Sequence, residues 1–150
     1  MGGYSALSPT TIAQIVLVIE LVFAGMLIVG MFLARRGNIR WHAHIQSIAV
    51  LGNVPVVATW MLPQYIANVW PGIPDEIGTP FYLYPTLMLI AGAVVEALGV
   101  YIILVAGTNL IPERFRFRNY KWWMRTLLCL WWGVLLLGLT TYYYWFLAPS

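Results

Sequence analysis

The sequence predicts an all-α membrane protein in which four transmembrane helices form an antiparallel bundle with both termini outside. Two observations predict this fold class: the composition of the chain and the positions of its basic residues. Of its 150 residues, 61% are hydrophobic and only 9% are charged, and the mean hydropathy is +0.80. A soluble domain of this length would need a larger polar surface, whereas long apolar stretches with few charges are typical of membrane spans.

Four apolar stretches are long enough to cross a bilayer, because a helical span needs about 20 predominantly apolar residues. We expect these spans at residues 11–34, 41–62, 81–106 and 122–146 of a single transmembrane domain. The spans and their loops use nearly the whole chain, so no separate soluble domain is expected.

Serine and proline residues set the expected ends of the spans. Ser8 and Pro9 predict a helix start, because serine caps helices and proline suits their first position. In the second span, Pro55 should introduce a kink and Pro63 should end the helix. Residues 64–80 would then form an interfacial loop with room for a short surface helix.

The basic residues predict the orientation of the spans. All eight lie in or beside the first and third loops, and the middle loop has none: Arg35, Arg36, Arg40, Arg114, Arg116, Arg118, Lys121 and Arg125. Cytoplasmic loops carry the excess of Lys and Arg, so loops 35–40 and 113–121 are expected in the cytoplasm of a prokaryotic cell. The alternating arginines and phenylalanines at 114–118 fit a membrane border better than a nucleic-acid site, so no nucleic-acid partner is expected.

Two carboxyl groups, Glu20 and Glu96, lie in the middle of the first and third spans. An ionised carboxylate at this depth costs about 3 kcal/mol, so such residues face the bundle interior and are paired or protonated. The two helices run in the same direction and place the carboxyls at similar depth. Two interpretations follow: proton handling or a hydrogen bond to a quinone or pigment, or two protonated carboxyls that hold helices together.

A polar stripe on the second span contains His42, Gln46 and Asn53, which share one helix face with Ala49. We expect this face to contact other helices, and these three polar residues are the candidates for cofactor binding, for example to a quinone head group. His44 points elsewhere, because residues two apart lie on different faces. The chain therefore has no bis-histidine haem site of its own. In the simpler interpretation, His42 bonds loop carbonyls or lipid phosphate at the interface.

The tryptophan pair Trp131-Trp132 lies in the middle of the fourth span, where Leu, Ile or Val is usual. Adjacent helical residues point about 100° apart, so one can face the bundle while the other faces a partner subunit or a lipid. Glycines provide further surfaces for close helix contacts, at Gly92, Gly99, Gly133 and Gly138.

Catalytic motifs of soluble enzymes are absent from the sequence, which contains no hydrolase motif, phosphate-binding loop or cluster of metal ligands. The single cysteine, Cys129, excludes an intrachain disulfide. We therefore expect no catalytic residue, no metal and no cofactor belonging to this chain alone, and leave open a bound lipid, quinone or pigment.

The four-span layout, the sequence Arg40-Trp41-His42 at the start of the second span and the basic loop before the fourth resemble one known family. This is the uncharacterised bacterial and archaeal membrane family called domain of unknown function 420. The resemblance implies a gene that lies near cytochrome oxidase assembly genes, and a role with haem or copper. The family's other histidines are replaced here by Gln64-Tyr65, Pro85-Thr86 and residues 118–121, so only His42 is shared.

Three functions remain open from the sequence. The first is a non-catalytic accessory subunit of a larger energy-converting membrane complex, such as a respiratory or photosynthetic assembly or a membrane monooxygenase. The second is a redox protein linked to haem or quinone, or an oxidase assembly factor. The third is a small proton-coupled carrier, against which the lack of an internal repeat argues. We expect the first, with membrane lipids and other integral membrane subunits as partners.

Overall fold

The computed structural model describes residues 8–149, and within this range every regular element is a helix. Four helical segments are long and apolar enough to cross a membrane: Pro9–Arg35, Ile39–Gly72, Pro80–Gly107 and Tyr120–Leu147. The first, third and fourth match the predicted spans to within two residues at each end. These segments are those expected of a multi-pass membrane protein.

The elements follow one another along the chain as α1 (Pro9–Arg35), α2 (Ile39–Val56), η1 (Val57–Met61), α3 (Leu62–Asn68), η2 (Trp70–Gly72), α4 (Pro80–Gly107), η3 (Glu113–Phe115), α5 (Tyr120–Tyr142) and η4 (Tyr143–Leu147). Segments η1 and η4 are π-helical, whereas η2 and η3 are short 3₁₀ turns. Both π-helical segments continue the helix that precedes them, so each widens a long helix without ending it.

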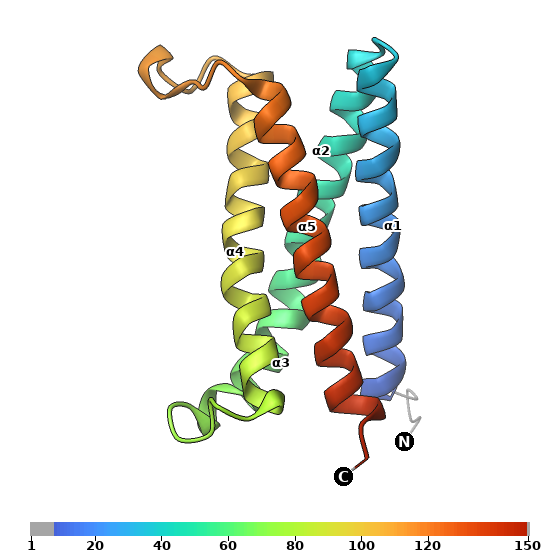
Figure 1. The fold of residues 1–150 in the computed structure, drawn as a ribbon, viewed down its shortest axis with the longest axis vertical. Coiled ribbons are helices and arrows are strands. Elements are labelled where there is room, and N and C mark those ends of the chain that lie inside the picture. The colour runs from blue at the N-terminus through green and yellow to red at the C-terminus, as the bar shows by residue number, and fades with distance from the viewer. Residues whose placement is uncertain (1–7, 150) are drawn as a thin grey trace, which may run out of the picture.

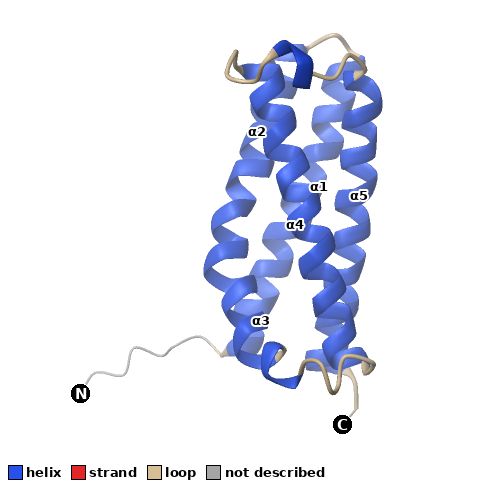
Figure 2. Ribbon diagram, turned by 90° about the vertical axis from the view of Figure 1, so that its left-hand side faces the viewer, coloured by secondary structure: helices blue, strands red, loops and turns tan. Residues whose placement is uncertain are grey.

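Consecutive long helices run in opposite directions, as Figure 1 shows. The loops at 36–38 and 108–119 therefore lie at one end of the molecule, and the loop at 73–79 lies at the other. Helix α1 packs closely on α2 and α4 packs closely on α5, while α1 also meets α5 and α2 meets α4 (Figures 1 and 2). All eight basic residues are consequently at or near the same end.

Side-chain caps begin three of the helices. Ser8 accepts a hydrogen bond from the backbone N–H of Thr11 at 3.2 Å, as its position before Pro9 predicts. Asn38 and Asn119 cap α2 and α5 in the same way. The turn between α1 and α2 needs only three residues because Gly37 adopts a positive φ of 80°, which glycine allows at low cost.

The loop between α4 and α5 is folded around Arg116. Its guanidinium donates hydrogen bonds to the backbone oxygens of Thr108 at 2.5 Å and Ile111 at 3.1 Å. The hydroxyl of Tyr101 donates to the backbone oxygen of Phe115. Arg116 thus satisfies carbonyls at and beyond the C-terminus of α4, where a positive charge is also favoured by the helix dipole.

The prediction that Pro63 ends the second helix is wrong, because the helix continues to Asn68 and is extended by a 3₁₀ turn to Gly72. Pro63 follows the π-helical segment η1, in which Leu62 donates its backbone N–H to the oxygen of Val57, five residues back. It is therefore in the first turn of α3, where the missing proline N–H is not needed. Most of the predicted loop 64–80 is consequently helix.

The core lies where the four helices meet, toward the end that carries the basic residues. Its buried side chains come from all the long helices: Ala24, Leu27, Ala49, Val50, Val95, Ile102, Leu127, Trp131 and Leu135. Gly99 lets α4 approach α2, since a Cβ at this position would lie 3.0 Å from Cγ1 of Val50. The predicted small-residue face of α4 therefore does pack against a neighbouring helix at Gly99.

We predict that Gly99→Ala lowers the free energy of unfolding by about 1–3 kcal/mol, the usual cost of overpacking. Val50 is β-branched and 1% exposed, so it cannot move aside easily. Thermal and denaturant unfolding in mild detergent measure the change. Gly25→Ala is the control, because a Cβ there meets no atom within 4 Å.

The double variant Gly99→Ala/Val50→Ala tests the cause, because the smaller side chain at position 50 makes room for the new methyl group. It should be less destabilised than the sum of its single variants. Two results would contradict the close approach as the reason. The first is strict additivity of the changes in the free energy of unfolding, and the second is an equal loss of stability in Gly99→Ala and Gly25→Ala.

Candidate functional site

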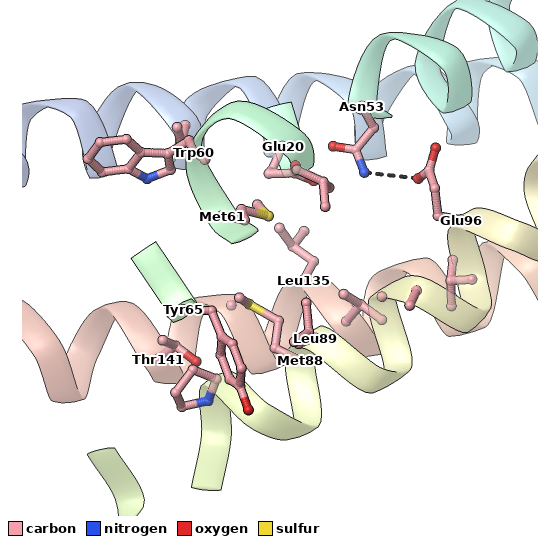
Figure 3. A pocket seen from close by; sticks show the side chains of 18 of the residues that line it. Glu20, Asn53, Trp60, Met61, Tyr65, Met88, Leu89, Glu96, Leu135 and Thr141 are labelled. Carbon is pink, nitrogen blue, oxygen red and sulfur yellow. Dashed lines mark hydrogen bonds between the residues drawn. The ribbon is translucent and has the colours of Figure 1, made fainter. Parts of the chain in front are cut away.

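A cavity of about 640 Å³ lies between the helices, in the half of the molecule away from the basic loops. Its volume is within the range of about 300–1,000 Å³ that is usual for small-molecule sites. All four membrane-spanning segments contribute to its lining, which is mostly aliphatic and aromatic. Figure 3 shows 18 of the lining side chains from close by.

Three polar residues line the cavity, each on a different helix: Glu20 on α1, Asn53 on α2 and Glu96 on α4 (Figure 3). The amide nitrogen of Asn53 donates a hydrogen bond to Oε2 of Glu96 at 3.1 Å. This bond orients the Asn53 amide so that its oxygen is free for another contact. The two carboxyls line the same cavity, as their similar depth predicts.

One oxygen of each of these residues has no hydrogen-bond partner among the described residues, although all three atoms are shielded from solvent. These atoms are Oε1 of Glu20, Oδ1 of Asn53 and Oε1 of Glu96. Asn53 itself is only 8% exposed. Unpaired buried polar groups are rare in proteins. Each one is therefore a candidate to bind a proton, a water molecule or a ligand.

No described residue that lines the cavity is Lys, Arg or His, so no cationic side chain pairs with the carboxyls there. Two uncompensated charges at this depth would be costly, because hydrocarbon and protein interior solvate ions poorly. The site therefore has more hydrogen-bond acceptors than donors, and it could bind a ligand group that donates hydrogen bonds.

The walls of the cavity are rich in aromatic side chains, contributed on one side by the second span and on the other by the end of the fourth. Trp60 belongs to η1, and Trp145 and Phe146 belong to η4, so both π-helical segments line the cavity. π-Helical turns are frequent at functional sites. Their presence on two sides of one cavity supports the assignment of the site.

Aromatic contacts join the helices around the end of the cavity farthest from the carboxyls. The indole N–H of Trp145 donates to the backbone oxygen of Phe81 at 3.1 Å, and the two rings stack with centroids 5.3 Å apart. Tyr84 and Tyr144 stack at the same distance. These contacts tie the first turns of α4 to η4 beside the cavity.

The side of the cavity along α4 is more open. Ala93 and Ala97 line the cavity, yet Ala93 is exposed and Ala97 and Glu96 are not fully buried. Small side chains at these positions leave the space beside the helix unfilled. The cavity therefore opens laterally along α4, at the depth of the membrane core.

The predicted polar stripe of α2 faces other helices, but it is divided between two neighbours. The Nδ1 of His42 donates a hydrogen bond to the backbone oxygen of Gly30 at 2.8 Å. The side-chain amide of Gln46 donates to the backbone oxygen of Leu27 at 3.1 Å. Both partners are on α1. Of the three predicted cofactor-binding residues, only Asn53 lines the cavity. The other two hold α2 against α1.

His44 is exposed, and its Nδ1 lies 2.7 Å from the backbone oxygen of Arg40 in the same helix. His42, in contrast, is 9% exposed and directed toward α1. The two imidazoles thus point to different sides of α2, as their spacing predicts.

The two neighbouring tryptophans differ in exposure. Trp131 is 3% exposed and lies in the core, where it also lines the cavity. Trp132 is half-buried. Because Trp131 is the inward-facing member of the pair, only Trp132 remains a candidate for the predicted contact with a partner subunit or a surrounding lipid.

Sequence reasoning missed the contribution to the cavity of the part of the second helical segment that follows Pro63. The expected helix end at residue 62 placed Tyr65 in a loop, whereas it is buried in α3, lines the cavity and bonds Thr86 through its hydroxyl at 3.1 Å. The signal that could have found it is the apolar and aromatic run that continues past Pro63.

Comparison with known proteins adds no family to these observations. No protein-family model matches the sequence, and neither the curated proteins nor the solved structures searched gave a match. Within residues 8–149, no group of three or more His, Cys, Asp or Glu side chains is arranged to hold a metal ion. The functional argument therefore rests on the geometry of the cavity.

We predict that Glu96→Gln preserves stability, while Glu96→Leu lowers the free energy of unfolding by about 1–3 kcal/mol, the cost of leaving a buried polar group unpaired. Glutamine still accepts from the Asn53 amide, and its own amide can donate to the unpaired oxygens of Glu20 or Asn53. Denaturant unfolding in mild detergent measures both variants.

The double variant Glu96→Leu/Asn53→Leu is the control, because removal of both partners leaves no amide without an acceptor. It should recover most of the loss seen in Glu96→Leu. If Glu96→Leu alone were as stable as the unaltered protein, the Asn53–Glu96 hydrogen bond would have no structural role.

Proposed function

We propose that this protein binds a lipid-soluble molecule between its membrane helices and acts as a non-catalytic accessory subunit of a larger energy-converting membrane complex. The observation that carries the proposal is the aromatic cavity of about 640 Å³ that ends at Glu20, Asn53 and Glu96. A site with apolar walls and a few convergent polar groups is the usual form of a small-molecule site.

The ligand is lipid-soluble because of where the cavity opens. Its lateral opening past the exposed Ala93 and Ala97 faces the hydrocarbon region of the proposed membrane. A molecule dissolved in the bilayer reaches such a site directly. Lipids, quinones and pigments all have the required apolar body.

The outer face of α5 supports a role within a larger assembly. Gly133 is exposed there, and an added Cβ would meet no atom within 4 Å, while the neighbouring Trp132 is half-buried and packs partly against the core. A large aromatic side chain beside a glycine notch suits a close contact with a helix of another subunit.

The proposed orientation places the loops at 36–38 and 108–119 in the cytoplasm of a prokaryotic cell, and the loop at 73–79 with both termini outside. The support is that all basic residues gather at or near one end of the helices, which is the end that stays in the cytoplasm. This orientation puts the cavity in the outer half of the membrane.

Two matched glycine substitutions separate ligand binding from assembly. Gly92 lines the cavity, with its nearest neighbour, Cγ1 of Val134, 3.6 Å from a Cβ at this position, whereas a Cβ at Gly133 would meet open space. We predict that Gly92→Leu depletes the bound small molecule and keeps the partner subunits. Gly133→Leu should weaken the association with partner subunits and keep the small molecule.

Purification of the tagged protein from native membranes in mild detergent provides both measurements. Mass spectrometry of the organic extract reports the small molecule, and the subunit ratio in the eluate reports the assembly. A protein that elutes alone would refute the accessory role, and an extract unchanged by Gly92→Leu would refute ligand binding in the cavity.

Labelling with a membrane-impermeant thiol reagent tests the orientation. The native Cys129 is first replaced, because it is exposed. We predict that Asp75→Cys is labelled from outside intact cells, whereas Arg118→Cys is labelled only after the cells are opened. Both positions are exposed loop residues, and Arg118 is preferable to Arg116, which holds the loop together. The opposite labelling pattern would reverse the orientation.

A further inference from the structure

We infer that the cavity binds a lipophilic primary amine, whose ammonium group takes the place of a proton on Glu20 or Glu96. This inference rests on the proposed binding of a lipid-soluble molecule in the cavity and names the chemistry of its head group. Three residues that line the cavity, each on a different helix, have an oxygen without a hydrogen-bond partner among the described residues.

The unpaired atoms are all acceptors: Oε1 of Glu20, Oδ1 of Asn53 and Oε1 of Glu96. The orientation of Asn53 fixes the position of its oxygen, because the amide nitrogen is already committed to Oε2 of Glu96 at 3.1 Å. An ammonium group has three N–H donors and no acceptor. It therefore has one donor for each unpaired oxygen.

Charge favours the same head group. Two carboxyls share an apolar cavity, and no Lys, Arg or His among the described lining residues balances them. One bound ammonium, one ionised carboxylate and one protonated carboxyl together carry no net charge. A neutral hydroxyl donor, such as that of a quinol, supplies a hydrogen bond but no positive charge. Both carboxyls would then have to be protonated for the site to carry no net charge.

The aromatic walls suit the apolar chain of the ligand. Trp60, Tyr65 and Trp131 line the cavity, and aromatic side chains pack well against apolar chains. Glu20 and Glu96 are both near the middle of long helices, α1 and α4. The head group of a phospholipid stays at the membrane surface, so this depth favours a free lipophilic amine over an aminophospholipid.

Binding of the amine displaces one proton. The ligand arrives as the ammonium ion, the carboxyl of Glu20 or Glu96 loses its proton to the medium, and the resulting carboxylate pairs with the ammonium. The other titratable lining groups are the phenols of Tyr65, Tyr101 and Tyr142.

The affinity for the amine should therefore rise with pH, because fewer protons compete for the carboxylate. It should fall again only where the amine itself loses its proton, at about pH 10.4 by analogy with lysine. A neutral ligand of the same length would show neither change.

Quenching of tryptophan fluorescence by brominated ligands tests the inference. The protein is placed in nanodiscs of phosphatidylcholine and titrated with ω-bromododecylamine, ω-bromododecanol or the trimethylammonium analogue of the amine. We expect saturable quenching by the amine, with affinity about tenfold or more above that of the alcohol, since paired buried charges contribute at least this much. The trimethylammonium ion has charge but no N–H donor, so it should also bind more weakly than the amine.

The double variant Glu20→Gln/Glu96→Gln should weaken binding of the amine by about tenfold or more. Glu113→Gln is the matched control, because it removes an exposed carboxylate in the loop before α5 and should change nothing. Equal affinity for amine and alcohol, or unchanged amine binding in the double variant, would overturn the inference. Neither result would affect the cavity itself, which depletion of the native ligand by Gly92→Leu tests separately.

Two further measurements use the unaltered protein. In a weakly buffered solution, the amine should release one proton per molecule bound and the alcohol none, and the absence of proton release would overturn the inference. Nanodiscs of phosphatidylethanolamine identify the source of the ammonium group. Unchanged affinity for the probe in these nanodiscs supports a free amine, whereas strong competition by this lipid would overturn that assignment.

Discussion

The absence of water inside a bilayer is the constraint on which this structure depends. Each backbone polar group in the hydrocarbon region must find a partner within the protein. The second span shows the effect, because its helix continues through η1 and past Pro63 where a soluble chain could turn out into solvent. The side chains of Asn38, Asn119 and Arg116 satisfy backbone groups at the ends of the helices in the same way.

The same constraint gives the polar face of α2 two separate tasks. Near the basic end, His42 and Gln46 bond the backbone oxygens of Gly30 and Leu27, so polar side chains there hold two helices together. One turn beyond the buried Ala49, Asn53 bonds Glu96 instead and leaves its own oxygen without a partner. The first two residues have hydrogen-bond partners on α1, and the third forms part of an incomplete set. In the proposed function, the same helix face thus changes from holding helices together to binding a ligand.

The number of helices and most of their limits could be predicted from the sequence, because hydropathy and helix caps act locally. The shared depth of Glu20 and Glu96 could also be predicted, since it depends only on helix direction and residue count. The Asn53–Glu96 hydrogen bond could not, because it depends on how α2 and α4 rotate and approach each other at Gly99. The error at Pro63 has a similar origin: the π-helical turn before it is a feature of the folded chain that no composition rule indicates.

The uneven packing between helices has a consequence for how the interior is reached. Helices α1 and α2 form one closely packed hairpin, and α4 and α5 form another, whereas α2 and α4 meet over a much shorter contact. The cavity lies along this seam between the two hairpins. The segment from Ile73 to Thr79 joins the two hairpins through hydrogen-bonded turns. The proposed ligand site thus lies where α2 and α4 meet over a short contact, so the residues that line it are largely not those that hold each hairpin together.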